Sequence, residues 1–142
     1  MFFVGRYEHS LDNKYRLRIP ARFRAEIGNE PAKIAKVENG CLVIYPAKTM
    51  QKIGQRIEEI GVTSENRLEL MRFMSNIFPV DEDSQGRFTL NANLREFAGI
   101  TKDIIFIGHI DRIYVWDKAR WEKHDSEITD NTKLSFLDKY GI

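Results

Sequence analysis

Apolar and polar residues alternate along two short stretches of the chain, and each stretch follows a polar turn. Between residues 14 and 19 the alternation has the period of two that places successive side chains on opposite faces of a strand. The residues expected on the apolar face are Tyr15, Leu17 and Ile19, and those on the polar face are Lys14, Arg16 and Arg18. In the later stretch Phe88 and Leu90 are expected to face inward, with Arg87 and Thr89 facing out. Each strand therefore offers one face to a core and a polar, mainly basic face to solvent or a ligand.

The same kinds of element are predicted after each of these stretches. Helical spacing with a following glycine predicts short helices over 21–27, ending at Gly28, and over 92–98, ending at Gly99. Other helices are predicted over 49–60, 66–77 and 118–128, with a frayed fourth over 131–140. Strands are predicted over 2–11, 40–45 and 111–116, with weaker candidates over 33–37 and 103–108.

The recurrence is an internal repeat. Asp12, Arg16 and Arg24 recur as Asp83, Arg87 and Arg95, and 83 minus 12, 87 minus 16 and 95 minus 24 all give 71. The shared pattern is Asp-x-x-x-Arg, an apolar-x-apolar strand and then x-Ala-x-x-Arg. Asp and Asn favour tight turns, so hairpin turns are predicted over 12–15 and 83–86. Gly86 suits a left-handed position in the second turn, whereas Tyr15 takes that place in the first.

The length and the repeat predict two small units that share one body. With 142 residues, each half has about 70 and would bury little core alone, so the halves are expected to pack together. The predicted α+β organisation has a first unit over 5–50, a helical connection over 51–75, a second unit over 76–121 and a C-terminal helix and tail over 122–142.

Composition indicates the cellular compartment and the kinds of partner that the protein is expected to bind. The net charge is only +1, but the first 24 residues hold 6 Lys and Arg against 2 Asp and Glu, which concentrates positive charge on the first motif. No apolar run approaches the ~20 residues of a membrane span, and no signal peptide is evident, so no membrane partner is expected. Cys41 is the single cysteine, which permits no intrachain disulfide and favours a reducing cytoplasm.

The Asp-x-x-x-Arg pair has two interpretations. In one, Asp12 stabilises its turn and Arg16 forms a surface ion pair worth little energy. In the other, the aspartate orients the arginine so that its planar donor fork reaches a phosphate or a guanine edge. The repetition of the motif favours the second interpretation, as do the cations beside its first copy, which are Lys14, Arg18, Arg22 and Arg24.

No pattern indicates an enzyme, a cofactor or a small-molecule substrate. His9, His109 and His124 lack the spacing of metal ligands, so no metal site is expected. The acidic run 81–83 is interpreted as a turn rather than as an acid/base pair, and Cys41 as a buried small hydrophobe. The chain has no serine nucleophile motif, phosphate loop or dinucleotide glycine pattern.

The motifs resemble the MraZ family of bacterial regulators over nearly the whole chain. The matching residues are Gly5, Tyr7, Leu11-Asp12-x-Lys14-x-Arg16, Ile19-Pro20-Ala21-x-Phe23-Arg24, Asp83-x-x-Gly86-Arg87, Ala92-Asn93-Leu94-Arg95, Ala98-Gly99-Ile100 and Trp116-Asp117-x-x-x-Trp121. The resemblance implies two tandem AbrB-like swapped-hairpin units packed as a pseudo-dimer, with flanking helices. It also implies a ring-shaped homo-oligomer, associated with the nucleoid, that binds direct repeats in the promoter of its own division and cell-wall gene cluster.

The resemblance also implies roles for particular residues. The arginine of Asp-x-x-x-Arg contacts DNA in the family, which transfers to Arg16 and to Arg87, with Asp12 and Asp83 orienting them. The full expected DNA-binding set is Arg16, Lys14, Arg18, Arg22, Arg24, Arg87 and Arg95. Tyr15 departs from the family, which usually has glycine there.

Because the second copy lies in the more acidic half, the first unit is expected to carry more of the DNA affinity and the second more of the oligomer contacts. The alternative hypothesis is a ring-forming protein-interaction scaffold that does not bind DNA and uses these arginines for ion pairs between subunits.

Overall fold

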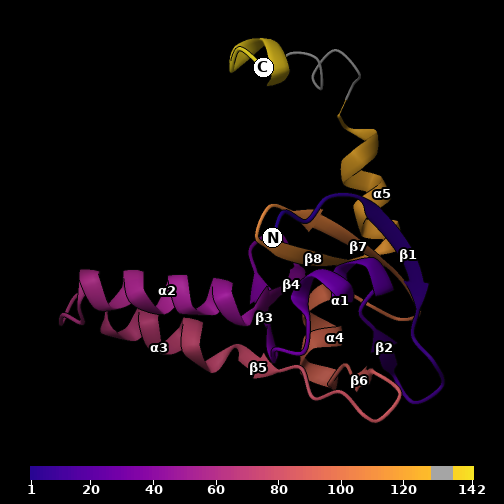
Figure 1. Ribbon diagram of the computed structural model, residues 1–142, viewed down its shortest axis with the longest axis horizontal. Helices are drawn as coiled ribbons and strands as arrows, with labels where there is room; N and C mark the ends of the chain where they lie inside the picture. Colours follow the sequence, from indigo (N-terminus) through magenta and orange to yellow (C-terminus); the bar gives the residue numbers. More distant parts are fainter. Residues whose placement is uncertain (129–135) are drawn as a thin grey trace.

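The computed structural model describes residues 1–128 and 136–142, and its elements follow one another twice in the same order (Figure 1). The first copy contains β1 (Arg6–Ser10), β2 (Arg16–Arg18), α1 (Ala21–Ile27), β3 (Ala32–Val37), β4 (Cys41–Pro46) and α2 (Ala47–Ile60). After α3 (Arg67–Ser75), the second copy contains β5 (Ile77–Pro79), β6 (Arg87–Thr89), α4 (Ala92–Ala98), β7 (Asp103–His109), β8 (Arg112–Asp117) and α5 (Lys118–Ser126).

The strands of the two copies exchange partners within one six-stranded antiparallel sheet. Its order is β1-β7-β8-β4-β3-β5, so β1 of the first copy pairs with β7 of the second, and β5 of the second pairs with β3 of the first. At the centre, β4 pairs with β8 through Val43 and Tyr114, which occupy equivalent positions of the two copies. The α+β fold of two swapped-hairpin units packed as a pseudo-dimer is therefore confirmed.

The strands that carry the motif form a separate two-stranded sheet, called here the β2–β6 ribbon. Its central pair is Leu17 with Phe88, again equivalent positions, and both side chains are buried. They join a core between the six-stranded sheet and the layer formed by the ribbon, α1 and α4, to which Phe23 and Leu94 contribute. The expected inward positions of Leu17, Ile19, Phe88 and Leu90 are confirmed, since all four side chains are buried.

Two reciprocal hydrogen bonds tie each copy to the other. The hydroxyl of Thr49 on α2 donates to the carbonyl of Asp111 at 2.5 Å, and Nη1 of Arg120 on α5 donates to the carbonyl of Gly40 at 2.7 Å. Thr49 and Arg120 occupy equivalent positions, and so do Gly40 and Asp111. The helix that ends each copy is thereby fixed to the hairpin turn of the other, which helps to hold the pseudo-twofold arrangement.

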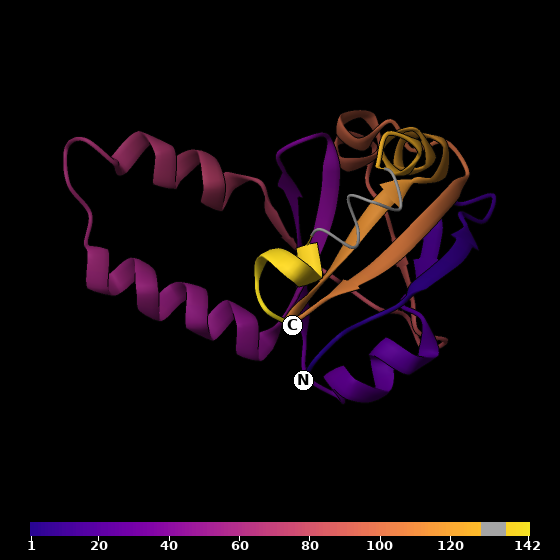
Figure 2. The same cartoon turned by 90° about the horizontal axis from the view of Figure 1, so that it is seen from above.

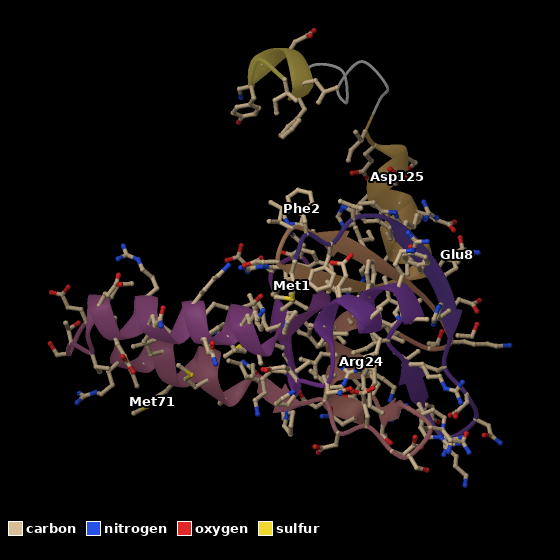
Figure 3. The ribbon with its side chains drawn as sticks, viewed as in Figure 1. Met1, Phe2, Glu8, Arg24, Met71 and Asp125 are labelled. Atoms are coloured by element: carbon tan, nitrogen blue, oxygen red, sulfur yellow. The ribbon has the colours of Figure 1, made fainter. Side chains whose placement is uncertain are left out.

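Helices α2 and α3 form an arm that extends away from the sheet (Figures 1 and 2). Ile53, Ile57, Leu70 and Phe73 line a groove of about 450 Å³ between the two helices. Leu68 is 76% exposed, and Met71, labelled in Figure 3, and Met74 are exposed as well. No helix in the described part of the chain is long and apolar enough to span a membrane.

Several predicted element boundaries differ from the structure. The predicted strand over 2–11 is shorter, at Arg6–Ser10, and the helix predicted from residue 49 begins at Ala47. The helix predicted over 66–77 ends at Ser75, because Ile77 pairs with Ala35 as part of β5. The helix predicted to residue 128 ends at Ser126. Of the predicted tail helix, residues 131–135 lie outside the described residues, and 136–139 form one helical turn.

The inward position predicted for Tyr15 is wrong. Its side chain is 46% exposed, because the residue belongs to the turn and has a left-handed φ of 60°. Strand alternation begins only with Arg16, where the pairing of β2 with β6 begins. An alternating pattern cannot by itself mark the residue at which a turn ends and a strand begins.

Candidate nucleic-acid interface

The basic face of the β2–β6 ribbon combines residues from both motif copies. In the antiparallel register Arg16 lies opposite Thr89, and Arg18 lies opposite Arg87. Side chains directly opposite one another share a face of the sheet, and that of Leu17 and Phe88 is buried. The arginines therefore lie on the outer face, and each strand needs the other to form it.

Both motif turns are closed by the same hydrogen bonds from an aspartate. Oδ1 of Asp12 accepts from the backbone N–H groups of Lys14 at 2.8 Å and Arg16 at 2.9 Å, while its Oδ2 accepts from Nε of Arg16 at 2.7 Å. Asp83 repeats this arrangement with the backbone N–H of Gln85 at 2.8 Å and with the backbone N–H and Nε of Arg87, both at 2.9 Å. One carboxylate thus holds both the turn and the arginine that follows it.

These bonds determine the charge state of the aspartates. Burial acts to raise the pKa of Asp12, but the hydrogen bonds from Arg16 and from the Lys14 backbone outweigh it, so the pKa lies below its usual value. The pKa of Asp83 is lowered chiefly by the backbone hydrogen bond from Arg87. Both side chains are therefore ionised at neutral pH, which keeps each arginine anchored through Nε.

The anchored arginines keep their outer donors. Among the described residues, no acceptor is hydrogen-bonded to the terminal Nη nitrogens of Arg16 or Arg87. Two parallel donors in a plane match a phosphate or the edge of a guanine. Arg18 is exposed on the ribbon and, among the described residues, makes only a long contact of 3.4 Å to the Gln85 side chain. Lys14 is exposed too, but the strand-face position predicted for it is wrong, because it belongs to the turn before β2.

The arginines that end the two motifs hold the opposite turns. Arg95 of the second copy places its guanidinium 3.5 Å from the centre of the Tyr15 ring and donates from Nε to the Leu90 carbonyl at 3.0 Å. Arg24 of the first copy, labelled in Figure 3, forms a 2.9 Å ion pair with Glu82, next to the second turn. Arg22 is exposed on α1. The structure therefore gives Arg24 and Arg95 partners within the chain.

The charge asymmetry between the sequence halves does not become a separation in space. The turn over 12–15 lies at the ribbon end occupied by Thr89, whereas Arg18, from the same copy, lies at the other end beside Arg87. The structure places both motif arginines on one surface. The expected division, with DNA contacts in the first unit and oligomer contacts in the second, stays a prediction.

Sequence reasoning missed the pairing of the two motif strands with each other and the ties made by Thr49 and Arg120. The repeat contained a signal for the pairing, since Leu17 and Phe88 are equivalent and apolar, as the central pair of a two-stranded pseudo-symmetric ribbon must be. Thr49 and Arg120 left no comparable signal, because each contacts a backbone carbonyl distant in the chain.

The other candidate chemistry is accounted for structurally. Cys41 is 3% exposed, and burial raises the pKa of its thiol to about 12, so the thiolate is scarce at neutral pH. Within the described residues, no group of three or more His, Cys, Asp or Glu side chains is placed to hold a metal ion. His9 and His109 each pack edge-on against an aromatic ring.

Comparisons with known proteins agree with this architecture. The family model described as MraZ protein matches the chain twice, over residues 2–72 and 73–136. The Transcriptional regulator MraZ of Clostridium beijerinckii is 35% identical over 142 residues, covering 99% of this chain and 99% of that protein. The regulator of the same name in Thermoanaerobacter sp. is 37% identical, covering 94% and 90%, and that of Syntrophomonas wolfei is 38% identical, covering 94% and 91%.

Proposed function

We propose that this chain, which belongs to the MraZ family of transcriptional regulators, binds promoter DNA sequence-specifically through its β2–β6 ribbon. The target is direct repeats ahead of its own division and cell-wall gene cluster. The protein acts in the cytoplasm on the nucleoid, without a cofactor and without catalysis. The transcription-regulator role is that of the family, and the DNA contacts, the target and the assembly are the proposal.

The observation that carries the proposal is the pair of aspartate-anchored arginines on one exposed ribbon. Arg16 and Arg87 are each fixed through Nε by a carboxylate, and among the described residues their Nη nitrogens have no hydrogen-bond acceptor. Arg18 lies opposite Arg87, and Lys14 is exposed in the turn before Arg16. Anchoring reduces the side-chain entropy lost on binding, because the arginine is already held in one conformation. Lys14 and Arg18 add phosphate contacts, which supply much of the affinity of proteins for DNA.

We also propose that the chain assembles into a ring-shaped homo-oligomer through its α2–α3 arm. The arm exposes Leu68, Met71 and Met74, and its groove leaves the apolar side chains of Ile57 and Phe73 only half-buried. At the base of the arm, Phe73, Phe97 and Trp116 line a hollow of about 920 Å³ together with Arg72. Apolar surface of this kind is typical of subunit interfaces. Several ribbons on one ring would bind adjacent repeats with a high effective concentration.

The competing function is a ring-forming scaffold that does not bind DNA. The ion pairs of Arg16 with Asp12 and of Arg87 with Asp83 favour it, because such pairs also occur as surface structure with no ligand. In that case the exposed Nη donors would contact acidic side chains of another subunit or protein.

A salt titration separates the two functions. Binding of the purified protein to DNA from upstream of its own gene is measured by fluorescence anisotropy at increasing salt, beside a scrambled fragment of the same length. The proposal predicts that the upstream fragment binds more tightly than the scrambled one. Its association constant should fall steeply with salt, with a slope of roughly −0.9 per neutralised phosphate when its logarithm is plotted against the logarithm of the salt concentration. Equal affinity for the two fragments, or no binding of either fragment, would instead support the scaffold. Arg16→Ala should reduce both the affinity and the salt slope, while Lys123→Ala, at an exposed cation on α5 away from the ribbon and the arm, leaves both unchanged.

A further inference from the structure

The two ends of the β2–β6 ribbon are chemically different, although the backbone turns are alike. At the end called here the tyrosine end, the turn 12–15 carries Lys14 and Tyr15. At the end called the glycine end, the turn 83–86 carries Gln85 and Gly86 at the equivalent positions. The pseudo-twofold relation therefore holds for the fold but not for the side chains that a ligand would meet.

Both ends have an acidic residue nearby, since at the tyrosine end the exposed Asp103 accepts a 2.8 Å hydrogen bond from the Ser10 hydroxyl, and two acidic residues stand before the glycine end. Asp81 and Glu82 precede its turn, whereas Ser10 and Leu11 stand at the equivalent positions before the tyrosine end. Glu82 is paired with Arg24, but Asp81 is exposed. A phosphate beside the turn would meet Gln85 at the glycine end, where Arg18 and Arg87 lie opposite one another, and the cation Lys14 at the tyrosine end.

The tyrosine end also presents a fixed aromatic side chain. Tyr15 is about half exposed, and one face of its ring is covered by the Arg95 guanidinium at 3.5 Å. Arg95 is itself held by its bond to the Leu90 carbonyl, and the backbone N–H of Leu90 donates to the Tyr15 carbonyl at 2.8 Å. The ring is thus supported on one side, and its exposed part lies next to Lys14 and Arg16.

We infer that the ribbon binds DNA in a single orientation, and that Lys14 and Tyr15 set this orientation, with Arg95 as the residue that positions Tyr15. The inference rests on the proposed function and adds a defined orientation of the ribbon on the DNA. Reversing the ribbon would place Gln85 and Gly86 against the phosphates that Lys14 and Tyr15 contact. In a ring of identical subunits related by rotation, ribbons of fixed polarity all point the same way, which matches direct rather than inverted repeats.

Directed DNA cleavage from the two turns tests the inference. Asn13→Cys and Ser84→Cys place a single thiol at equivalent, exposed positions at opposite ends of the ribbon. Each carries an iron–EDTA reagent that cuts nearby DNA, here a fragment from upstream of the chain's own gene. Cys41 is buried and its thiol pKa is raised to about 12, so the native cysteine is not expected to react. Ser64→Cys, exposed in the loop of the arm, serves as the matched control.

The expected result is cleavage by Asn13→Cys on one side of each repeat and by Ser84→Cys on the opposite side. The preference for one side should be about tenfold, as expected from the loss of one good contact on reversal. Adding Lys14→Gln and Tyr15→Gly to the Ser84→Cys chain should bring cleavage to both sides. Specific binding with two-sided cleavage in the unaltered ribbon, or unchanged one-sided cleavage after the added substitutions, would overturn the inference alone. Failure of every chain to bind the fragment would overturn the proposed function as well.

Discussion

The two motif turns form the same hydrogen bonds around different residues. Tyr15 has a φ of 60° and Gly86 a φ of 75°, and in both turns an aspartate accepts from the same backbone N–H positions and from the same arginine Nε. Glycine adopts this conformation freely, whereas tyrosine does so at a cost. At the first turn the Tyr15 ring gains its contact with Arg95, for which Gly86 has no side chain.

The two turns share their backbone geometry but differ in the side chain that precedes the motif arginine. The aspartate hydrogen bonds are common to the two turns, whose backbone geometry is alike although one has tyrosine and the other glycine at the left-handed position. The residue at the left-handed position differs between the copies. Arg16 therefore follows a tyrosine ring, whereas Arg87 follows a glycine with no side chain. Substitutions in both copies can therefore test each role separately.

The largest effect is expected from the motif arginines. Arg16→Ala should weaken binding to the upstream DNA by at least tenfold, in line with ~1–3 kcal/mol for one specific arginine contact. Arg87→Ala should weaken it less, because Arg87 lies at the end flanked by Asp81. Fluorescence anisotropy measures both, with Lys123→Ala on α5 as the control. A greater loss for Arg87→Ala would reverse the assigned order of the two copies.

The aspartates should affect folding stability to a similar degree in the two copies. Asp12→Ala and Asp83→Ala each remove three hydrogen bonds and should lower the melting temperature, whereas Asp→Asn retains a backbone acceptor and should lower it less. Thermal denaturation followed by circular dichroism provides the measurement. A clear drop for only one aspartate would show that the turns differ in more than their displayed residues.

The same aspartates predict a pH dependence. Because the folded pKa of each is lowered, its stabilising contribution is complete above the ordinary Asp pKa of ~3.9 and is lost as the pH falls through the lowered value. The difference in melting temperature between the unaltered chain and Asp12→Asn should therefore shrink on acidification in that range. A difference that persists at strongly acid pH would exclude ionisation of Asp12 as its cause.

The hydrogen bonds of Thr49 and Arg120 connect the two copies away from the ribbon, and the effects of removing each can be compared. Thr49→Val keeps the shape of a side chain that is 1% exposed but removes its bond to the Asp111 carbonyl, which should cost ~1–2 kcal/mol of unfolding free energy. Arg120→Met removes the equivalent bond to the Gly40 carbonyl and should also destabilise the fold. Urea denaturation measures both, and no loss for either variant would show that the reciprocal ties do not stabilise the pseudo-dimer.

The smallest effect is expected from coupling between Tyr15 and Arg95. A double-mutant cycle of Tyr15→Gly and Arg95→Ala should give a coupling energy of ~0.5–1 kcal/mol, as found for exposed cation–π pairs. Arg95→Ala should thus destabilise the chain less once Tyr15 is glycine. Arg24→Ala in the same two backgrounds is the control, because its partner Glu82 lies at the other turn. Equal effects of Arg95→Ala in both backgrounds would show that the stack is not energetically significant.

Much of the candidate site follows from local pattern. The turns, the inward positions of Leu17 and Phe88 and the short helices after them depend on residues close in the chain, and the structure confirms them. The limits of α3 could not be predicted in the same way, because Ile77 leaves the helical pattern only through its pairing with Ala35. Tyr15 was misplaced because alternation does not show where a turn gives way to a strand.

The sequence by itself determined that two similar units exist and that each pairs an aspartate with an arginine four residues later, because repetition and turn chemistry are local properties of the chain. Only the tertiary structure decided that β2 pairs with β6, that Arg18 lies opposite Arg87, and that Arg95 and Arg24 each serve the turn of the other copy. These contacts join residues far apart in the chain, so they depend on the exchange of strands that brings the two copies into one body.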